Sequence, residues 1–279
     1  MKNIFLLLIF SLLVCNSGIG QSTLEKAEKS LSKKKEKNNS RGDSRSYTYS
    51  DSSDSENNFI ADTFGALFLD IFLAVTYGII IETPFEQEYT ASQASLTKYP
   101  YHSGAKGNFS YEHGDDTTIF KTTIADRYIV ENGKIYGNQL MAEFWFVKRI
   151  SLKANYLQLW EDNIHFENNS LAMYQGLAKY HRIRTERFNA WWGLGATYVD
   201  GEVDETGFTY GLGAALFLAK PISIEADFMQ TFINNETVNQ FSTLMNYHIK
   251  RYKVSGGYEH LKLGIEDFSM FSIGVGVSF

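Results

Sequence analysis

The sequence predicts an all-β protein, a closed antiparallel up-and-down transmembrane β-barrel of about ten strands, with eight to twelve strands compatible. Three observations support this fold class. An apolar leader opens the chain, alternating aromatic and β-branched stretches of about a dozen residues repeat from Thr117 onward, and the connections between those stretches alternate between two kinds. Length allows one large β-domain, and only three prolines interrupt it.

Residues 1–20 are predicted to be a signal peptide. Met1-Lys2-Asn3 leads into an apolar run from Ile4 to Val14, and small residues precede Gln21, so cleavage is expected between Gly20 and Gln21. The single cysteine, Cys15, lies inside this leader. The mature chain therefore has neither a disulfide nor a thiolate to offer as a metal ligand or nucleophile.

Residues 21–57 are predicted to be a disordered periplasmic linker. They are rich in Ser, Lys, Glu, Asp and Asn, and this composition buries too little apolar surface to offset chain entropy. The tripeptide Arg41-Gly42-Asp43 within this linker is interpreted as a chance occurrence.

Residues 58–82 are predicted to form an apolar, membrane-associated helix, because Phe64, Leu67, Phe68, Ile71 and Phe72 recur at helical spacing. A spanning helix and extra strands stay open as alternatives. Asp70 in the middle of the segment disfavours spanning, since a carboxylate is costly in hydrocarbon. Residues 83–115, with two prolines and three glycines, form a connecting region with one short strand near 109–112.

The barrel is assigned to residues 116–279. Each predicted strand is long enough to cross hydrocarbon when tilted. The ten strands are 117–130, 134–146, 150–160, 170–182, 188–199, 207–218, 222–233, 238–249, 252–262 and 268–279.

Two kinds of connection alternate between these strands. Short basic turns lie at 147–149, 183–187, 219–221 and 250–251, and longer acidic loops lie at 161–169, 200–206, 234–237 and 263–267. The connection 131–133 is a short hairpin that belongs to the second set. Alternate turns of a meander share a rim, so the short turns and the C-terminus are predicted to define the periplasmic rim.

Each strand has one apolar face, which we interpret as the face that meets lipid. The last strand shows this most clearly, because Phe271, Ile273, Val275, Val277 and Phe279 alternate with Ser and Gly. Aromatic residues near the strand ends would form girdles at the two interfaces. A soluble β-sandwich that buries the same faces is the alternative interpretation.

The terminal Phe279, the alternation from Phe188 to Tyr198 and the leader peptide resemble the small bacterial outer-membrane β-barrels of the OmpA-like kind. The resemblance covers roughly residues 117–279. It implies that the barrel-assembly machinery recognises the final strand through Phe279, Val277 and Val275. It also implies an outer-membrane location, with lipid and lipopolysaccharide around the barrel and with the N-terminal tail and C-terminus in the periplasm.

The opposite face of the strands carries a balanced set of charges, which we expect to form a paired network in the lumen. Strand register predicts that Glu143 lies directly across from Lys153, with Phe146 opposite Ile150. Small residues on the same face, such as Gly213 and Gly274, are interpreted as room for long side chains, with a narrow water path as the alternative. The eight charged residues are Lys121, Arg127, Glu143, Lys153, Glu225, Asp227, Lys253 and Glu259.

A non-enzymatic envelope protein, which scaffolds the envelope or binds through its surface loops, is the function predicted, with a partner of unknown identity. A narrow channel or transporter and an outer-membrane hydrolase are the alternatives. No cofactor, metal site or catalytic residue is predicted, and His165, His248 and His260 are interpreted as loop or interfacial residues. Nucleic acid is not an expected partner, since Asp and Glu (32) outnumber Lys and Arg (26).

Overall fold

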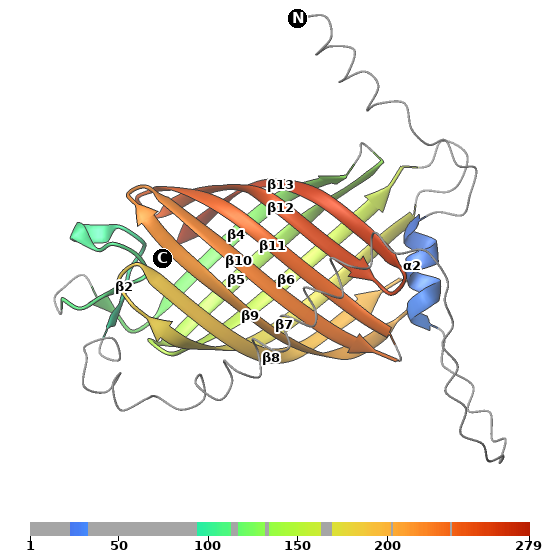
Figure 1. The fold of residues 1–279 in the computed structure, drawn as a ribbon, viewed down its shortest axis with the longest axis horizontal. Helices are drawn as coiled ribbons and strands as arrows, with labels where there is room; N and C mark the ends of the chain where they lie inside the picture. The colour runs from blue at the N-terminus through green and yellow to red at the C-terminus, as the bar shows by residue number, and fades with distance from the viewer. Residues whose placement is uncertain are drawn as a thin grey trace, which may run out of the picture.

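A computed structural model describes residues 23–32, 94–112, 117–131, 134–162, 169–201, 203–234 and 236–279. Ten strands form a closed barrel (Figure 1). The strands are β4 (Lys121–Glu131), β5 (Ile135–Val147), β6 (Ile150–Glu161), β7 (Asn169–Arg184), β8 (Phe188–Asp200), β9 (Glu205–Ala219), β10 (Ile222–Ile233), β11 (Glu236–Ile249), β12 (Tyr252–Leu263) and β13 (Glu266–Ser278).

The barrel is an antiparallel meander in which each strand pairs with its neighbours in sequence. The first and last strands, β4 and β13, pair from Thr123↔Ser278 to Val130↔Phe271 and close the sheet. Phe279 extends this seam, because its N–H donates to the Thr122 carbonyl at 2.9 Å. The predicted ten-stranded antiparallel barrel is confirmed. The first strand was placed too early, since Thr117–Thr118 forms a separate strand, β3.

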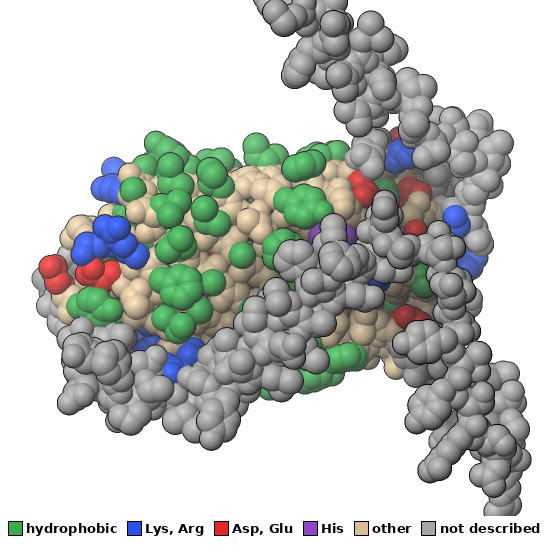
Figure 2. All heavy atoms as spheres, viewed as in Figure 1, with side chains coloured by type: hydrophobic (Ala, Val, Ile, Leu, Met, Phe, Trp, Pro, Cys, Tyr) green, Lys and Arg blue, Asp and Glu red, His purple; other side chains and the backbone are tan. Residues whose placement is uncertain are grey.

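The outward face of the barrel is apolar around its circumference. Exposed fractions reach 46% for Leu140, 54% for Phe208 and 62% for Val275, and the residues between them in each strand point inward. Figure 2 shows apolar side chains spread over the visible flank, with charged side chains towards the two ends. A soluble sandwich buries such a face between two sheets, so this arrangement is that of a membrane-spanning barrel.

The short turns after β5, β7, β9 and β11 lie at the end of the barrel where β13 finishes. We call this end the C-terminal mouth. The connections after β4, β6, β8, β10 and β12 lie at the opposite end, which we call the loop mouth. The longer loops predicted at 234–237 and 263–267 were wrong, because β11 and β13 each begin after only two connecting residues, as in the short turns. The predicted division of the turns into two rims is confirmed by this order of strands.

One helix, α2 (Thr23–Ser32), covers the loop mouth. Leu24, Ala27 and Leu31 recur along one side of α2 and are at most 1% exposed, because they pack on the inner walls of the barrel. The prediction of disorder from residue 21 onward was therefore wrong for these ten residues. Their apolar stripe is too small to hold a helix alone, and the barrel supplies the missing partner surface.

The position of α2 also corrects the predicted topology. The Leu31 carbonyl and the Ser30 hydroxyl accept hydrogen bonds from Asn234 and Ile265 at the loop mouth, whereas the chain ends at the C-terminal mouth (Figure 1). Thr23–Ser32 and Phe279 therefore lie on opposite sides of the barrel, and the prediction of a single periplasmic side for both does not hold for this helix.

A small insert covers the C-terminal mouth. Strands β1 (Ser95–Thr97), β2 (Phe109–Ser110) and β3 form a three-stranded antiparallel sheet, with a 3-10 turn at His102–Gly104. The ring of Phe109 meets Trp145 edge to face at 5.7 Å. The short strand predicted near 109–112 is thus present.

Several predictions fall outside the described residues. These are the leader with its Gly20/Gln21 cleavage site, the linker beyond Ser32, the apolar segment 58–82 and the loop histidine His165. Among the helices that the structure describes, none has the length and hydropathy to cross a membrane.

Candidate functional site in the barrel lumen

The lumen is divided into two halves of different chemistry. Beneath α2 the inward side chains are apolar and form one continuous core with Leu24, Ala27 and Leu31 of the helix. The barrel contributes Ile129, Ile135, Leu157, Leu159, Leu171, Met173, Val199, Val203, Ile233, Val238, Leu261, Leu263, Phe268 and Met270 to this core. We call this region the apolar half.

The half nearer the C-terminal mouth holds the charged residues, and we call it the charged half. All eight residues predicted for the lumen network have inward-facing side chains, and none is an exposed residue. Glu143 is the register partner of Lys153, as predicted. A β-bulge between Trp145 and Val147 places Val147, rather than Phe146, opposite Ile150. The bulge absorbs one residue at the turn and leaves the register of Glu143 unchanged.

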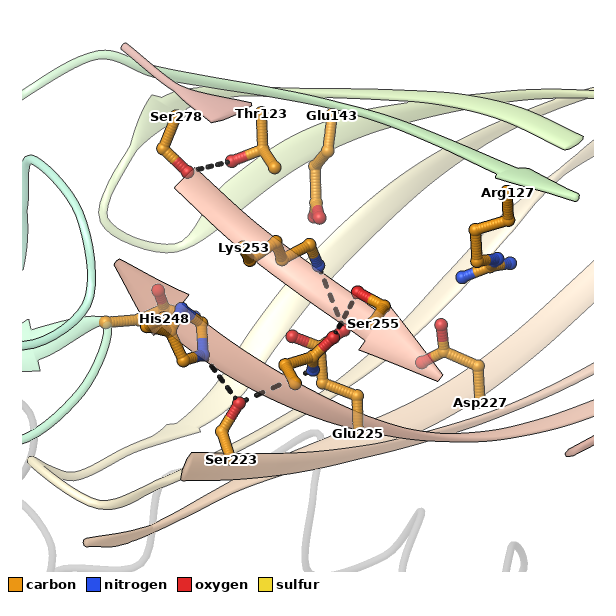
Figure 3. A network of polar contacts seen from close by, with 12 residues as sticks. Thr123, Arg127, Glu143, Ser223, Glu225, Asp227, His248, Lys253, Ser255 and Ser278 are labelled. Carbon is orange, nitrogen blue, oxygen red and sulfur yellow. Dashed lines mark hydrogen bonds and ion pairs between the residues drawn. The ribbon is translucent and has the colours of Figure 1, made fainter. Parts of the chain in front are cut away.

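The charges pair between strands that are not adjacent. In three of the ion pairs, Arg127–Glu259, Lys179–Glu143 and Lys253–Glu225, one strand lies between the two partners, whereas Lys153–Asp227 joins the distant strands β6 and β10. Lys153 Nζ lies 2.8 Å from Asp227 Oδ2 of β10, although its register partner is Glu143. Arg127 Nε lies 3.1 Å from Glu259 Oε1, and its guanidinium also donates to Gln139. Lys253 Nζ lies 3.5 Å from Glu225 Oε2 (Figure 3). Long side chains in a narrow barrel reach past the neighbouring strand, so strand adjacency alone does not decide their partners.

Sequence reasoning missed Lys179 and His181 of β7. Lys179 Nζ contacts Glu143 Oε1 at 2.7 Å and lies 4.1 Å from the centroid of the Trp191 ring. The His181 ring stacks on Trp145 at 3.7 Å. Lys179 and His181 are two residues apart and alternate with outward residues in the same phase as Gln175 and Leu177. This alternation could have identified both as lumen residues from the sequence.

Glycines on the inward face give these side chains room. A Cβ at Gly213 would collide with the carboxylate of Asp227, and a Cβ at Gly274 would lie 2.5 Å from Cγ of Arg127. This supports the interpretation that the small residues accommodate long side chains from neighbouring strands.

A cavity of about 80 Å³ remains in the charged half, beneath the insert. Pro100 and Asn108 line it from the insert. Thr123 and Ser278 line it from the β4–β13 seam, and their hydroxyl oxygens are 3.1 Å apart (Figure 3). The cavity is a polar space that residues of both the insert and the barrel line.

Ser223 Oγ lies 2.8 Å from His248 Nε2, and both residues are buried, so His248 lies in the lumen rather than at the interface that the sequence predicted. Two further clusters in the barrel also bring serine and histidine together. In the lumen, Ser151 Oγ lies 2.9 Å from His181 Nε2, and His181 Nδ1 lies 3.1 Å from Asn189 Oδ1. Ser151 and His181 are both 0% exposed. The Ser151 hydroxyl also donates to Glu143 at 2.6 Å, which draws its proton away from the imidazole. Full burial leaves no approach for a substrate, so this cluster is best explained as a packed polar network.

The second cluster lies on the outward face near the loop mouth. Ser269 Oγ is 3.4 Å from His260 Nδ1, and His260 Nε2 is 3.5 Å from Asp267 Oδ1. Tyr258 also contacts Ser269 Oγ, at 3.0 Å. A serine, a histidine and a carboxylate in this order could support nucleophilic chemistry, although both of the histidine distances are long for hydrogen bonds.

No group of three metal-ligating side chains occurs within the parts of the chain that the structure describes. The residues named for barrel assembly, Val275, Val277 and Phe279, lie along β13 and the residue after it, where Val275 and Phe279 are more than 60% exposed on the outward face.

No protein-family model and no curated protein matches the sequence. Solved structures do match. A KdgM porin is 11% identical, with a TM-score of 0.38, and the match covers 56% of this chain and 99% of that one. Ail of Yersinia pestis in a nanodisc is 15% identical, with a TM-score of 0.33 over 57% and 99% of the two chains. The N-terminal barrel domain of OprF from Pseudomonas aeruginosa is 10% identical, with a TM-score of 0.30 over 57% and 97%.

These proteins are small bacterial outer-membrane β-barrels, which is the resemblance that the sequence also shows. The likeness concerns the fold.

Proposed function

We propose that this chain is a non-enzymatic outer-membrane barrel, closed to solutes, that serves as an envelope scaffold and presents its loop mouth for binding or adhesion. The observation that carries the proposal is the packing of side chains in both halves of the lumen. The apolar half is a packed core, and in the charged half ion pairs join side chains from strands that are not adjacent. A resting channel would need a connected water path through both halves.

Barrel residues bind both ends of α2, which supports a closed loop mouth. The carboxylate of Glu161 accepts hydrogen bonds from the Thr23 and Leu24 N–H groups at 3.1 and 2.9 Å. At the other end of the helix, the Asn234 side-chain amide donates to the Leu31 carbonyl at 2.9 Å. A carboxylate at a helix N-terminus and a donor at its C-terminus satisfy groups that a helix leaves unpaired.

The insert provides a matching closure at the C-terminal mouth. The Tyr101 hydroxyl donates to the Ile222 carbonyl at 2.6 Å, and its ring meets Phe217 edge to face. Lys121 Nζ donates to Asn108 Oδ1 at 2.7 Å. These contacts support a role in which the barrel is an anchor rather than a conduit.

Liposome swelling with arabinose tests this proposal. The full folded chain should give swelling rates equal to those of protein-free liposomes if the packed side chains close the lumen as proposed. A variant with four glycines in place of Leu24, Ala27, Glu28 and Leu31 removes the α2 contacts and should leave the lumen closed, since the core of side chains beneath is intact. Rapid swelling with the unaltered chain would favour the channel alternative.

A hydrolase is a second candidate, because Ser269, His260 and Asp267 lie together on the outward face. Release of a fluorescent fatty acid from a labelled phospholipid is the assay. Our proposal predicts no release above background and no difference between the unaltered chain and Ser269→Ala. Turnover that Ser269→Ala abolishes and Tyr258→Phe retains would replace the scaffold with an enzyme.

The apolar outward face of the barrel and the predicted signal peptide together support a location in the bacterial outer membrane. We propose an outer-membrane location, with lipid and lipopolysaccharide around the barrel, and recognition of Val275, Val277 and Phe279 by the assembly machinery. The exposed positions of Val275 and Phe279 on one face of the last strand support such recognition. Loss of the heat-modifiable form in cells after Phe279→Ser, with normal folding of the same variant in detergent, is the expected result.

A further inference from the structure

The cavity in the charged half has an excess of positive charge on its walls. Seven basic side chains line it, against three carboxylates. The basic residues are Lys121, Arg127, Lys153, Lys179, Lys250, Arg251 and Lys253, and the acidic ones are Glu143, Glu225 and Asp227. Each of the three carboxylates already contacts a lysine, and Arg127 contacts Glu259. Lys250 and Arg251 are exposed to solvent at a turn, so Lys121 is the buried cation with no carboxylate in contact among the described residues.

Lys121 is 3% exposed. Its ammonium carries three N–H donors, and the hydrogen bond found for it within the described chain goes to the neutral amide oxygen of Asn108. An ammonium that leaves water without a counter-charge is costly, and further cations in the same wall raise that cost. The remaining donors have the cavity as their neighbour, because Lys121 lines it.

Neutral donors complete the wall on the side of Lys121. Thr123 and Ser278 line the same cavity with their hydroxyls, and Lys253 extends towards it from β12 (Figure 3). At about 15 Å³ for each water-sized position, a cavity of about 80 Å³ offers roughly five such positions. Four oxygen atoms around a central atom occupy a space of that order. Several donors and a net positive wall are what binds a tetrahedral oxyanion.

We propose that this cavity is a binding site for a small oxyanion of the phosphate or sulfate class, with Lys121 as its principal ligand and the hydrogen-bonded hydroxyl pair of Thr123 and Ser278 as the source of one additional donor. Asn108 belongs to the insert, so the anion lies where the insert meets the barrel. Occupancy therefore neutralises the charged half and ties the insert to the C-terminal mouth. This site goes beyond the scaffold role, and it does not require conduction.

Isothermal titration of the purified, folded full chain with inorganic phosphate, at constant ionic strength in chloride, is the test. We expect saturable binding at one site, with sulfate competing. Lys121→Met should weaken phosphate binding at least tenfold. Lys106→Met is the matched control. Lys106 lies in the insert, as Asn108 does, but it pairs with Glu186 outside the cavity, so the Lys106→Met variant should bind phosphate as tightly as the unaltered chain does.

Asn108→Asp keeps the proposal falsifiable if Lys121→Met does not fold. The new carboxylate would supply the missing counter-charge to Lys121, so this variant should fold at least as well as the unaltered chain and lose phosphate binding at least tenfold. Unchanged affinity in Asn108→Asp, equal loss in Lys106→Met, or no saturable binding in the unaltered chain would each overturn the proposal.

A second titration, with a phospholipid, distinguishes a free phosphate ion from a lipid headgroup as the natural ligand of the cavity. Short-chain phosphatidic acid below its micelle concentration carries the same phosphate chemistry on a lipid. Binding of inorganic phosphate that depends on Lys121 assigns the site to free anions, whereas binding of the lipid alone with the same dependence assigns it to a lipid headgroup. Lipid binding that survives Lys121→Met counts against the site.

Discussion

The two halves of the lumen close the same barrel by different physical means. The apolar half is filled by aliphatic side chains that the helix α2 completes, and its packing is non-directional. The charged half is filled by side chains whose carboxylate and ammonium groups meet between strands that are not adjacent. Packing tolerates exchange of similar shapes, whereas a buried ion pair requires both of its partners. The two halves of the lumen should therefore respond very differently to conservative substitutions.

The largest expected difference is between Asp227→Asn and Leu159→Met. Asp227→Asn conserves shape but leaves the Lys153 ammonium buried without its carboxylate, which should lower the free energy of unfolding by about 3–5 kcal/mol. Leu159→Met conserves volume and should cost less than about 1.5 kcal/mol. Urea unfolding in lipid vesicles measures both values.

The double variant Lys153→Met, Asp227→Leu is the control for that comparison. Removal of both charges should recover most of the stability that Asp227→Asn loses, because no unpaired charge remains. Equal losses in Asp227→Asn and Leu159→Met would show that the two halves do not differ in the way described.

The surface ion pair of Lys106 and Glu186 sharpens the same point. Lys106 is 51% exposed, so Glu186→Gln should change the free energy of unfolding by less than about 1 kcal/mol. A loss in this variant as large as that of Asp227→Asn would mean that burial is not what makes the lumen pairs important.

An intermediate effect is expected where α2 joins the apolar half. Glu161→Gln removes the negative charge beside the Thr23 and Leu24 N–H groups, which should weaken docking of the helix by about 1 kcal/mol. Hydrogen exchange in Thr23–Ser32 should become about fivefold faster, while exchange in β12 stays unchanged. Equal acceleration in both would indicate general loosening of the barrel rather than release of α2.

The smallest effect concerns the insert over the charged half and depends on pH. Burial is the main cause that raises the pKa of the Tyr101 hydroxyl above its usual value of 10.0, with Arg187 acting against it. The neutral hydroxyl is the form that donates to Ile222, so its contribution is complete below pH 10 and is lost as pH rises through the raised pKa.

Proteolysis of the insert should therefore accelerate above pH 10 in the unaltered chain. Tyr101→Phe should show faster cleavage already at pH 8 and no further change between pH 10 and 11. If the cleavage rate rose equally with pH in the unaltered chain and in Tyr101→Phe, titratable groups other than Tyr101 would cause the pH dependence.

The positions of the strands, and which side chains point to lipid or to the lumen, could be predicted because period-two alternation is a local property of the sequence. Val275 faces lipid and Glu143 faces the lumen for the same reason. Register across a short turn, as for Glu143 and Lys153, is also nearly local.

Partners across the lumen could not be predicted. Lys153 and Asp227 are 74 residues apart in sequence, and their contact depends on barrel diameter and on the room that Gly213 leaves. The helix α2 was missed because three small or aliphatic residues in a Lys- and Glu-rich segment stabilise a helix only when a barrel mouth covers them. The cavity was missed because it requires the insert and the barrel together.

Single-channel recording of the purified full chain in planar bilayers tests the central claim of a closed lumen most directly. The predicted result is a flat baseline at ±100 mV in 1 M KCl, with protein insertion verified by its heat-modifiable migration. Regular step openings of uniform size in the unaltered chain, abolished when the barrel is heat-unfolded before addition, would contradict the account.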